Sequence, residues 1–391
     1  MPLSGIRVID LTRILAGPFC TQMLADMGAE VIKIESPEGD PVRVQGAVVN
    51  GFSWYFAQFN RNKKSIVLDL YSDAGKTALA DLIRGADVLV ENFRPGVLAR
   101  MGFDADRLKA LNPGLVVGSV NGFGSTGPYV DRPSFDFIAQ AMSGFMATTG
   151  EQDGDPMRAG PPIADQIAGL YCAFGIVCAL RARDGAAAGA GQRVEAALST
   201  GLISMMAYLS AERFATGREP VRTGNNHPIV APYGLFRAAD GRVAVAPSTQ
   251  AMVERFMACI GLSHLLADPR FETNALRMAN RPALLALIDD RMQRMPVDHW
   301  IAAVNAAGCP CGRVMDLGEV FSDPQVLAQQ MVIDYDQPGR GPARIMGFPV
   351  KLSETPARLH RPPPELGQHT DAVLADLGYD AARIAAARGE G

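Results

Sequence analysis

Asp165 is the residue of this chain whose surroundings best suit covalent chemistry. It precedes residues 166–180, a stretch without a charged side chain. Such an apolar stretch predicts a helix buried on nearly every side, entered through Pro162 and carrying Asp165 near its first turn. The positive end of the helix dipole would keep that carboxylate ionised, as a nucleophile requires. The alternative interpretation is an N-cap that only satisfies backbone N–H groups.

A second motif, residues 122–127 (GFGSTG), has the glycine spacing of a dinucleotide-binding loop and follows a predicted strand. A loop of that kind must run into a helix whose N-terminus receives the pyrophosphate. Here Pro128, Asp131 and Pro133 continue the loop instead. We therefore reject NAD or FAD binding and expect no permanently bound cofactor.

The cysteines and histidines do not indicate a metal site. The pair Cys309 and Cys311 has no second pair and no histidine nearby, and the five histidines have no ligand spacing. The cysteines stand mostly in apolar surroundings, which predicts reduced core residues. They are Cys20, Cys172, Cys178, Cys259, Cys309 and Cys311.

Composition limits the class of protein. With 48% hydrophobic residues, 20% charged residues and a net charge of −4, the chain has the balance of a globular protein and no basic field for nucleic acid. The N-terminus lacks a signal-peptide pattern, and no apolar run reaches the roughly 18 to 20 residues of a membrane helix. We expect a cytoplasmic protein that binds neither nucleic acid nor membrane.

Strand and helix patterns alternate through the first 120 residues, which predicts an α/β fold with a parallel, Rossmann-like sheet. An Asp-Gly turn at Asp240 between two apolar strands predicts a hairpin in a second, smaller α/β domain. We expect the large domain in residues 1–216, the small one in 217–335, and a return segment with two helices in 336–391. The expected strands of the sheet are residues 6–11, 29–35, 65–70, 87–90 and 115–120, and the expected helices include 16–27, 73–84, 96–101, 104–111, 166–180 and 201–216.

Several segments together resemble the family III CoA-transferases, the CaiB/BaiF family. The resemblance begins with residues 10–18 (DLTRILAGP), 28–35 (GAEVIKIE) and 60–65 (NRNKKS). It continues in family order through VENFRPG, the GFGSTG loop, FDFIAQ, the Asp165 stretch and the hairpin, and so covers nearly the whole chain. It implies a large Rossmann-like domain built from both chain ends, a smaller central domain, and an interlocked homodimer.

The resemblance also implies a reaction. In these enzymes an aspartate in the position of Asp165 attacks an acyl-CoA thioester, which gives an acyl-aspartyl anhydride and CoA thiolate. The thiolate then forms an aspartyl-CoA thioester, and an acceptor carboxylate repeats the sequence in reverse. The activity implied is a CoA-transferase whose partners are an acyl-CoA and a carboxylic acid.

The CoA site implied by the resemblance lies mainly after the fourth predicted strand. Phosphates need cations, and Phe93 could pack near adenine. Leu15 and Phe135 stand where the formyl-transferring members have Gln and Tyr, and those departures weaken the transfer of single contacts. The alternative for each residue is a solvated charge or an ordinary core side chain. The candidates are Leu15, Lys63, Lys64, Asn92, Phe93, Arg94, Arg100, Met101 and Phe135.

The acyl group implied is dicarboxylic, as in succinyl-CoA, and its second carboxylate would need a cation or a polar group. Arg43, Arg158, Arg222 and His227 are the candidates. Formyl-CoA and oxalate are disfavoured, because Pro247 to Gln250 replace the glycine-rich loop of the formyl-transferring members.

Three alternatives remain. An α-methylacyl-CoA racemase needs two acid-base groups, and Phe135 stands where racemases carry a His. A carnitine-type transferase would share the fold and the nucleophile. A non-catalytic CoA-binding protein would keep the phosphate contacts but would not need Asp165. Because a buried charge without a function is costly, the presence of Asp165 argues against this alternative.

Overall fold

The computed structural model describes residues 1–185 and 189–390. Within them the chain forms two compact units. The first combines Met1–Phe145, Ala159–Ala207 and the residues from Pro324 onwards, so both chain ends contribute to it. The second combines Met146–Arg158 with Tyr208–Asp323.

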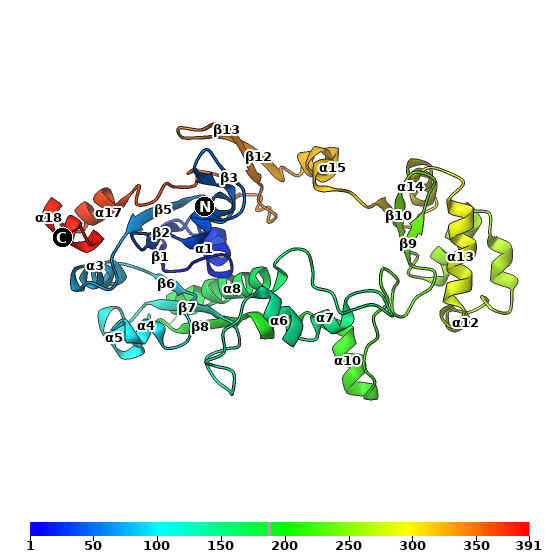
Figure 1. Ribbon diagram of the computed structural model, residues 1–391, viewed down its shortest axis with the longest axis horizontal. Coiled ribbons are helices and arrows are strands. Elements are labelled where there is room, and N and C mark those ends of the chain that lie inside the picture. The colour runs from blue at the N-terminus through cyan, green and yellow to red at the C-terminus, as the bar shows by residue number, and fades with distance from the viewer. Residues whose placement is uncertain (186–188, 391) are drawn as a thin grey trace. The chain divides into compact units, whose positions relative to one another are not determined.

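A six-stranded parallel sheet forms the centre of the first unit (Figure 1). Its strand order, β5-β2-β1-β6-β7-β8, makes the chain reverse direction across the sheet between β1 and β6. This is the order of the doubly wound dinucleotide-binding folds, and it confirms the predicted parallel α/β sheet. The strands are β1 (Arg7–Asp10), β2 (Glu30–Glu35), β5 (Lys63–Val67), β6 (Val88–Glu91), β7 (Val116–Asn121) and β8 (Arg193–Ala197).

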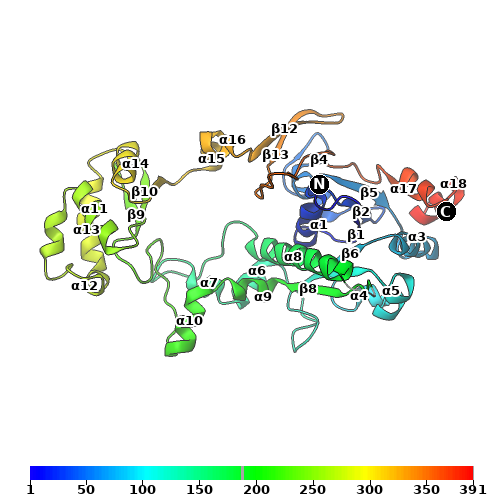
Figure 2. The same ribbon diagram turned by 180° about the vertical axis from the view of Figure 1, so that it is seen from behind.

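Alternate residues of the strands enter two apolar layers. Val8 belongs to the layer that contains α1 (Ala16–Asp26) and α8 (Ile163–Gly185). Its neighbour Ile9 belongs to the opposite layer, with the helices from the chain ends. Because helices cover both faces of this parallel sheet, apolar residues that point to either face are buried. Figures 1 and 2 show the C-terminal helices beside α3. These helices are α3 (Asp73–Arg84), α17 (Thr370–Asp376) and α18 (Ala381–Arg388).

Helix α8 packs closely on α1. A Cβ atom at Gly169 would lie 2.5 Å from the carbonyl oxygen of Ala16, so only glycine allows this approach. Helix α8 is also long and apolar enough to cross a membrane by length and composition, although half of its most apolar window is buried inside the fold. We interpret it as a core helix. Within this chain the prediction of burial on nearly every side is wrong, since Leu170, Tyr171 and Phe174 are exposed. The homodimer that the resemblance implies stays a prediction.

The first unit also contains shorter elements. Asp136, at the start of α6, follows a loop that begins after β7, so the GFGSTG segment does not open a helix, as expected from its prolines. The elements are η1 (Pro41–Val44), β3 (Val48–Val49), β4 (Phe52–Ser53), α2 (Trp54–Asn60), α4 (Val97–Arg100), α5 (Ala105–Leu111), α6 (Asp136–Met142), α9 (Leu198–Ser204) and α16 (Pro324–Ala328).

The second unit contains the predicted hairpin, which β9 (Gly234–Arg237) and β10 (Arg242–Val245) confirm. Strand β11 (Cys311–Arg313) pairs with β10, and Phe236 and Trp300 are buried in the core beneath. The helices of this part of the chain are α7 (Phe145–Thr148), α10 (Ala207–Thr216), α11 (Gln250–Cys259), η2 (Ser263–Ala267), α12 (Asn274–Ala279), α13 (Arg281–Met292), α14 (Val297–Ala306) and α15 (Leu317–Ser322).

Two expected elements differ from the structure. The single helix expected at residues 201–216 is divided into α9 and α10, because the backbone at Ala207 has a φ of 46°, outside the right-handed region. The return segment, for which only two helices were expected, also contains most of the hairpin of β12 (Val332–Gln337) and β13 (Gly341–Met346). Beyond the hairpin the chain does run along β5, where Asn62 bonds the backbone of Arg358, His360 and Arg361.

A buried ionic network lies at the end of β1. Asp10 and Lys63 are both fully buried, with 3.1 Å between Oδ2 and Nζ, and Thr21 donates its hydroxyl to Asp10. Burial lowers the pKa of Lys63 to about 8, although Asp10 lies beside it. Burial also opposes the charge of Asp10, but Lys63 and Lys33 outweigh it and the pKa of Asp10 lies below its ordinary value.

We therefore predict opposite sensitivities for two neighbouring lysines. Lys63→Met should lower the free energy of unfolding by about 3 to 5 kcal/mol, because it leaves the buried Asp10 charge without its closest cation. Lys64→Met is the matched control. Lys64 pairs with Glu30 at a partly exposed position, so its loss should cost less than about 1 kcal/mol. Urea unfolding followed by circular dichroism measures both values, and equal losses would contradict the buried network.

Candidate active site

Two cavities lie beside the loops that follow β1 and β6, at the point where the sheet order reverses. Ligands of open α/β sheets bind at this point, outside the carboxyl ends of the strands. The Lys76 cavity, about 560 Å³, is lined by residues 36–40, Lys76 and Met101 among others. The Asp165 cavity, about 530 Å³, is lined by Leu15, Phe135 and Asp165 among others. Arg13, Phe93, Val97 and Arg100 line both cavities.

Asp165 is the third residue of α8 and partly buried. Its carboxylate makes no hydrogen bond or ion pair with any residue that the structure describes. At the start of this helix, the backbone N–H of Ala164 donates to Oδ1 of Asp136 at 2.8 Å and not to the Asp165 carboxylate. Asp136, and not Asp165, thus acts as a cap for α8. The Asp165 carboxylate is left to face the cavity.

The protonation of Asp165 differs from the sequence-based expectation. Burial, and then the charge of Asp136, raise the pKa of Asp165 to about 7. The helix dipole therefore does not hold the pKa of this carboxylate at or below its ordinary value, and near neutral pH only part of the population is ionised. Desolvation and a second carboxylate oppose the dipole and exceed it. Raised carboxyl pKa values of this kind are typical of functional sites.

Asp136 is a site residue that sequence reasoning missed. It is buried, and Gln140 donates to its Oδ2 at 2.7 Å from one turn further along α6. The side-chain oxygen of Gln140 accepts from the backbone of Ala159 at 2.8 Å. Helix α6 thereby holds both ends of the loop that leads into α8. The FDFIAQ segment does contain a carboxylate and an amide four residues apart, Asp136 and Gln140. The candidate predicted in this segment was Phe135 instead.

Several cations line the cavities without an ion pair to any described residue. Arg94 and Arg100 were predicted, and both line the Asp165 cavity. Arg13, Lys76 and Arg132 were missed, because nothing in the sequence distinguishes them from surface charges. A cavity lined by unpaired cations suits an anionic ligand.

The remaining CoA-site candidates divide by position. Asn92 and Phe93 lie at the cavities, but both polar atoms of the Asn92 amide are engaged by the backbone of Arg13. Leu15 is buried in the wall of the Asp165 cavity, and Phe135 is an exposed part of that wall. Met101 lines the Lys76 cavity and lies against the apolar layer below it.

Lys63 and Lys64 line neither cavity. The ammonium of Lys63 is enclosed by Asp10, Thr21, Asn60 and the carbonyl of Pro18. Lys64 binds Glu30 at 2.5 Å. Their interpretation as phosphate-binding cations is replaced by structural roles, because each charge already has a carboxylate partner within the fold.

Arg43, the first candidate for binding the second carboxylate of the acyl group, lines neither cavity. Arg43 pairs with Glu35 at 2.7 Å, lies 3.6 Å over the ring of Phe56 and donates to the Pro364 carbonyl. That guanidinium is already engaged, which corrects its interpretation as a substrate-binding group.

The other three candidates, Arg158, Arg222 and His227, belong to the second unit. Arg222 donates to the carbonyls of Ala147, Glu151 and Gly154. His227 lies between Tyr208 and Tyr233, and burial together with Arg281 lowers its pKa.

Comparisons with known proteins agree with the resemblance. The sequence model of CoA-transferase family III matches residues 3–370. The succinate–glutarate CoA-transferase of Agrobacterium fabrum is 38% identical, with 96% of each chain covered. The acetyl-CoA:oxalate CoA-transferase of Acetobacter aceti is 39% identical, with 90% of this chain and 89% of the relative covered. Among solved structures, a CAIB/BAIF family protein from Brucella suis has a TM-score of 0.87 and 38% identity, with 96% of this chain and 99% of that chain covered.

Replacing Asp165 by Asn should remove a pH-dependent loss of stability. The folded chain holds the Asp165 proton up to about pH 7, whereas the unfolded chain releases it near the ordinary value of 3.8. Relative to the variant, the free energy of unfolding of the wild type should therefore fall by about 2 to 3 kcal/mol between pH 5 and pH 8. Urea unfolding of both proteins at the two pH values measures this change. A constant difference would show that Asp165 is not desolvated.

Proposed function

The chain belongs to CoA-transferase family III and is an enzyme that transfers CoA, and from that premise we propose that its donor is a dicarboxylic acyl-CoA such as succinyl-CoA. The acceptor is a carboxylic acid. The observation that carries this proposal is the Asp165 cavity, in which one carboxylate without a polar partner among the described residues faces a wall that includes unpaired cations. The name of the Agrobacterium relative supports this donor class, since succinate and glutarate are both dicarboxylates. The Acetobacter relative is named for a dicarboxylate, oxalate, and for acetyl-CoA, whose acyl group is monocarboxylic.

The reaction follows from exchange between carboxylates. A carboxylate oxygen of Asp165 attacks the thioester carbonyl, the carbon–sulfur bond breaks, and an acyl-aspartyl anhydride and CoA thiolate result. The thiolate attacks the aspartyl carbonyl, which releases the donor acid and leaves an aspartyl-CoA thioester. The acceptor carboxylate then attacks this thioester, and the thiolate that leaves attacks the acceptor carbonyl of the new anhydride. The products are the new acyl-CoA and the free Asp165 carboxylate.

The residues of the two cavities serve this sequence in distinct ways. Asp165 must be ionised to attack, and a pKa of about 7 leaves a large ionised fraction at neutral pH while keeping the oxygen poorly solvated. Lys76 and Arg100 supply charge for the CoA phosphates in the Lys76 cavity. Arg132 supplies charge beside the acyl group in the Asp165 cavity.

The covalent intermediate can be detected directly. Incubation of the wild type with succinyl-CoA should add the mass of CoA to the chain through the aspartyl thioester, and intact-protein mass spectrometry should detect it. Asp165→Asn should show no adduct and no exchange, because an amide oxygen is a poor nucleophile. Asp73→Asn, which changes an exposed aspartate in the first turn of α3, is the matched control and should form the adduct normally. A CoA adduct on Asp165→Asn, or none on the wild type, would contradict the mechanism.

The substrate class is tested with a panel of donors and acceptors. Succinyl-CoA paired with glutarate or oxalate should exceed butyryl-CoA paired with acetate by roughly tenfold to hundredfold in kcat/KM, the range of a charge-assisted contact. Oxalate is included because it is part of one relative's name, although sequence reasoning disfavoured it. Exchange confined to monocarboxylic pairs would rule out the dicarboxylate proposal and leave the transferase activity intact.

A further inference from the structure

Arg13 occupies the junction of the two cavities. It is one of four residues that line both, and its guanidinium makes no ion pair with a described residue. The guanidinium lies 5.6 Å from the centre of the Phe93 ring, which also lines both cavities. An exposed, unpaired arginine at such a junction could reach a ligand that extends through both spaces.

The backbone of Arg13 is held from one side by Asn92. The N–H of Arg13 donates to Oδ1 of Asn92 at 2.9 Å, and Nδ2 of Asn92 donates to the Arg13 carbonyl at 2.8 Å. One amide therefore binds both backbone groups of one residue. Arg13 follows β1 and Asn92 follows β6, so this contact joins the two strands between which the sheet order reverses.

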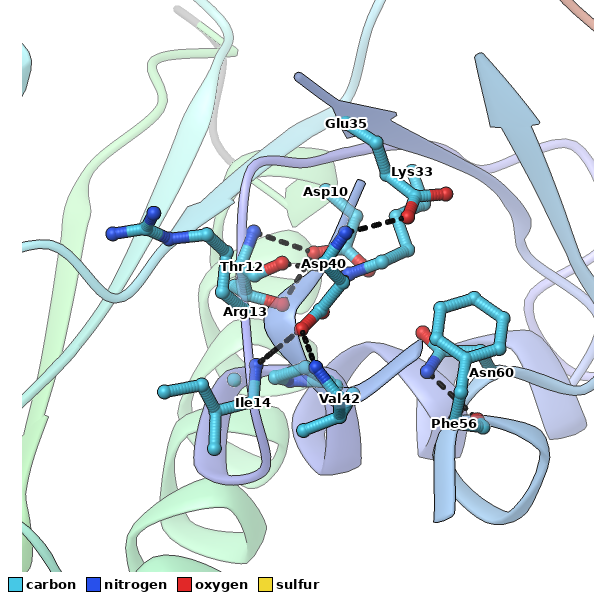
Figure 3. Close-up of polar contacts among 12 residues, drawn as sticks. Asp10, Thr12, Arg13, Ile14, Lys33, Glu35, Asp40, Val42, Phe56 and Asn60 are labelled. Carbon is cyan, nitrogen blue, oxygen red and sulfur yellow. Dashed lines mark hydrogen bonds and ion pairs between the residues drawn. The ribbon is translucent and has the colours of Figure 1, made fainter. Parts of the chain in front are cut away.

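The peptide groups on either side of Arg13 are held by a buried ion pair. Lys33 and Asp40 have fully buried side chains, with 2.9 Å between Nζ and Oδ2. Lys33 donates to the Thr12 carbonyl at 2.7 Å, and the N–H of Ile14 donates to Asp40 at 3.2 Å (Figure 3). The Arg13 guanidinium points away from this network in the same view.

The conformation of Ile14 shows that these contacts impose the shape of the loop. Ile14 has a φ of 71°, in the left-handed region that a β-branched residue avoids. Such a conformation costs about 1 to 3 kcal/mol and persists only where the surroundings determine it. The Asp40 carboxylate, which also accepts a hydrogen bond from the N–H of Val42, holds Ile14 in this conformation.

We propose that Lys33, Asp40 and Asn92 form a rigid mount for Arg13, which binds an anionic oxygen group of the acyl-CoA at the junction of the two cavities. Arg13 is the contact residue, and the other three are positioning residues. This inference rests on the proposed function for the identity of its ligand. The mount fixes the backbone from which the guanidinium extends before the ligand arrives, which reduces the entropy lost on binding.

Two parts of an acyl-CoA carry the required chemistry. The phosphates of CoA could meet Arg13 from the Lys76 cavity, and the free carboxylate of a dicarboxylic acyl group could meet it from the Asp165 cavity. Isothermal titration distinguishes them with four probes. Free CoA and 3′-dephospho-CoA are titrated into chains with Asp165 intact, and succinyl-CoA and butyryl-CoA into chains with Asp165→Ala, which prevents turnover.

Arg13→Ala should weaken binding by roughly tenfold to hundredfold, the range of a charge-assisted hydrogen bond. An equal loss for CoA, succinyl-CoA and butyryl-CoA assigns Arg13 to a phosphate, and a loss that disappears with 3′-dephospho-CoA assigns it to the 3′-phosphate. A loss confined to succinyl-CoA assigns it to the acyl carboxylate. Arg13→Lys should restore part of the affinity. Arg84→Ala, which removes an equally charged but cavity-remote side chain of α3, should change nothing.

The mount is tested by a double-mutant cycle. For a probe whose binding Arg13→Ala weakens, Asp40→Asn should weaken binding by roughly threefold to tenfold when Arg13 is present and by less than about twofold in the Arg13→Ala background, because Asp40 acts through Arg13. Equal losses in both backgrounds would overturn the positioning role. If Asp40→Asn fails to fold by circular dichroism, Asn92→Ala gives the same cycle at a partly exposed position.

Different results would overturn the role of Arg13 and the proposed function. Normal binding of all four probes by Arg13→Ala would overturn the assignment of Arg13 and leave the proposed function standing. Absence of CoA binding to the wild type would overturn the proposed function itself.

Discussion

The burial of opposite charges under the ends of β1 and β2 is the constraint on which the site depends. Asp10, Lys33 and Lys63 are fully buried and Asp40 nearly so, and a charge removed from water is costly unless partners surround it. Burial and attraction oppose each other throughout this group. The pKa of Lys33 is raised because Asp40, Asp10 and Glu35 together outweigh its desolvation. Each charge thus fixes the position of the others and of the loop between β1 and α1.

In the turn between β1 and α1, this network takes the structural role that glycine residues have in other proteins. In dinucleotide-binding sheets the first strand–helix turn carries glycines, which adopt unusual backbone angles and let phosphate approach the backbone. Here the same turn carries Ile14 at a φ of 71°, held by the Asp40 carboxylate. The result is a turn with little freedom that presents an arginine side chain. Anion recognition at this turn would then use a guanidinium instead of the N–H groups of Arg13 and Ile14, which already donate to Asn92 and Asp40.

Sequence reasoning identified the parallel sheet, the hairpin, α8 and the family, because all of these depend on local periodicity or ordered motifs. It could not distinguish Lys63 from Lys64. The two are adjacent on one strand and point to opposite faces, and the partner that buries Lys63 is 53 residues away in sequence. Arg43 was misassigned for the same reason, since its engagement by Glu35 and Pro364 exists only in the folded chain. Asp136 was missed because the helix residue that it caps, Ala164, lies 28 residues further along the chain, and the local spacing of Asp136 and Gln140 does not reveal that contact.

Two groups of arginines and lysines can be distinguished in the first unit. Arg43, Lys33, Lys63 and Lys64 are neutralised by carboxylates within the fold. Arg13, Lys76, Arg94, Arg100 and Arg132 line the cavities without such partners among the described residues. With a net charge of −4, the chain as a whole offers no attraction to an anion, so the attraction must come from these unpaired positions. The one carboxylate left facing the Asp165 cavity without a polar partner is the group whose pKa is raised to about 7. The fold thus separates charges that stabilise it from charges that line the cavities. Cations together with one unpaired carboxylate are the combination that we expect transfer between anionic carboxylates to require.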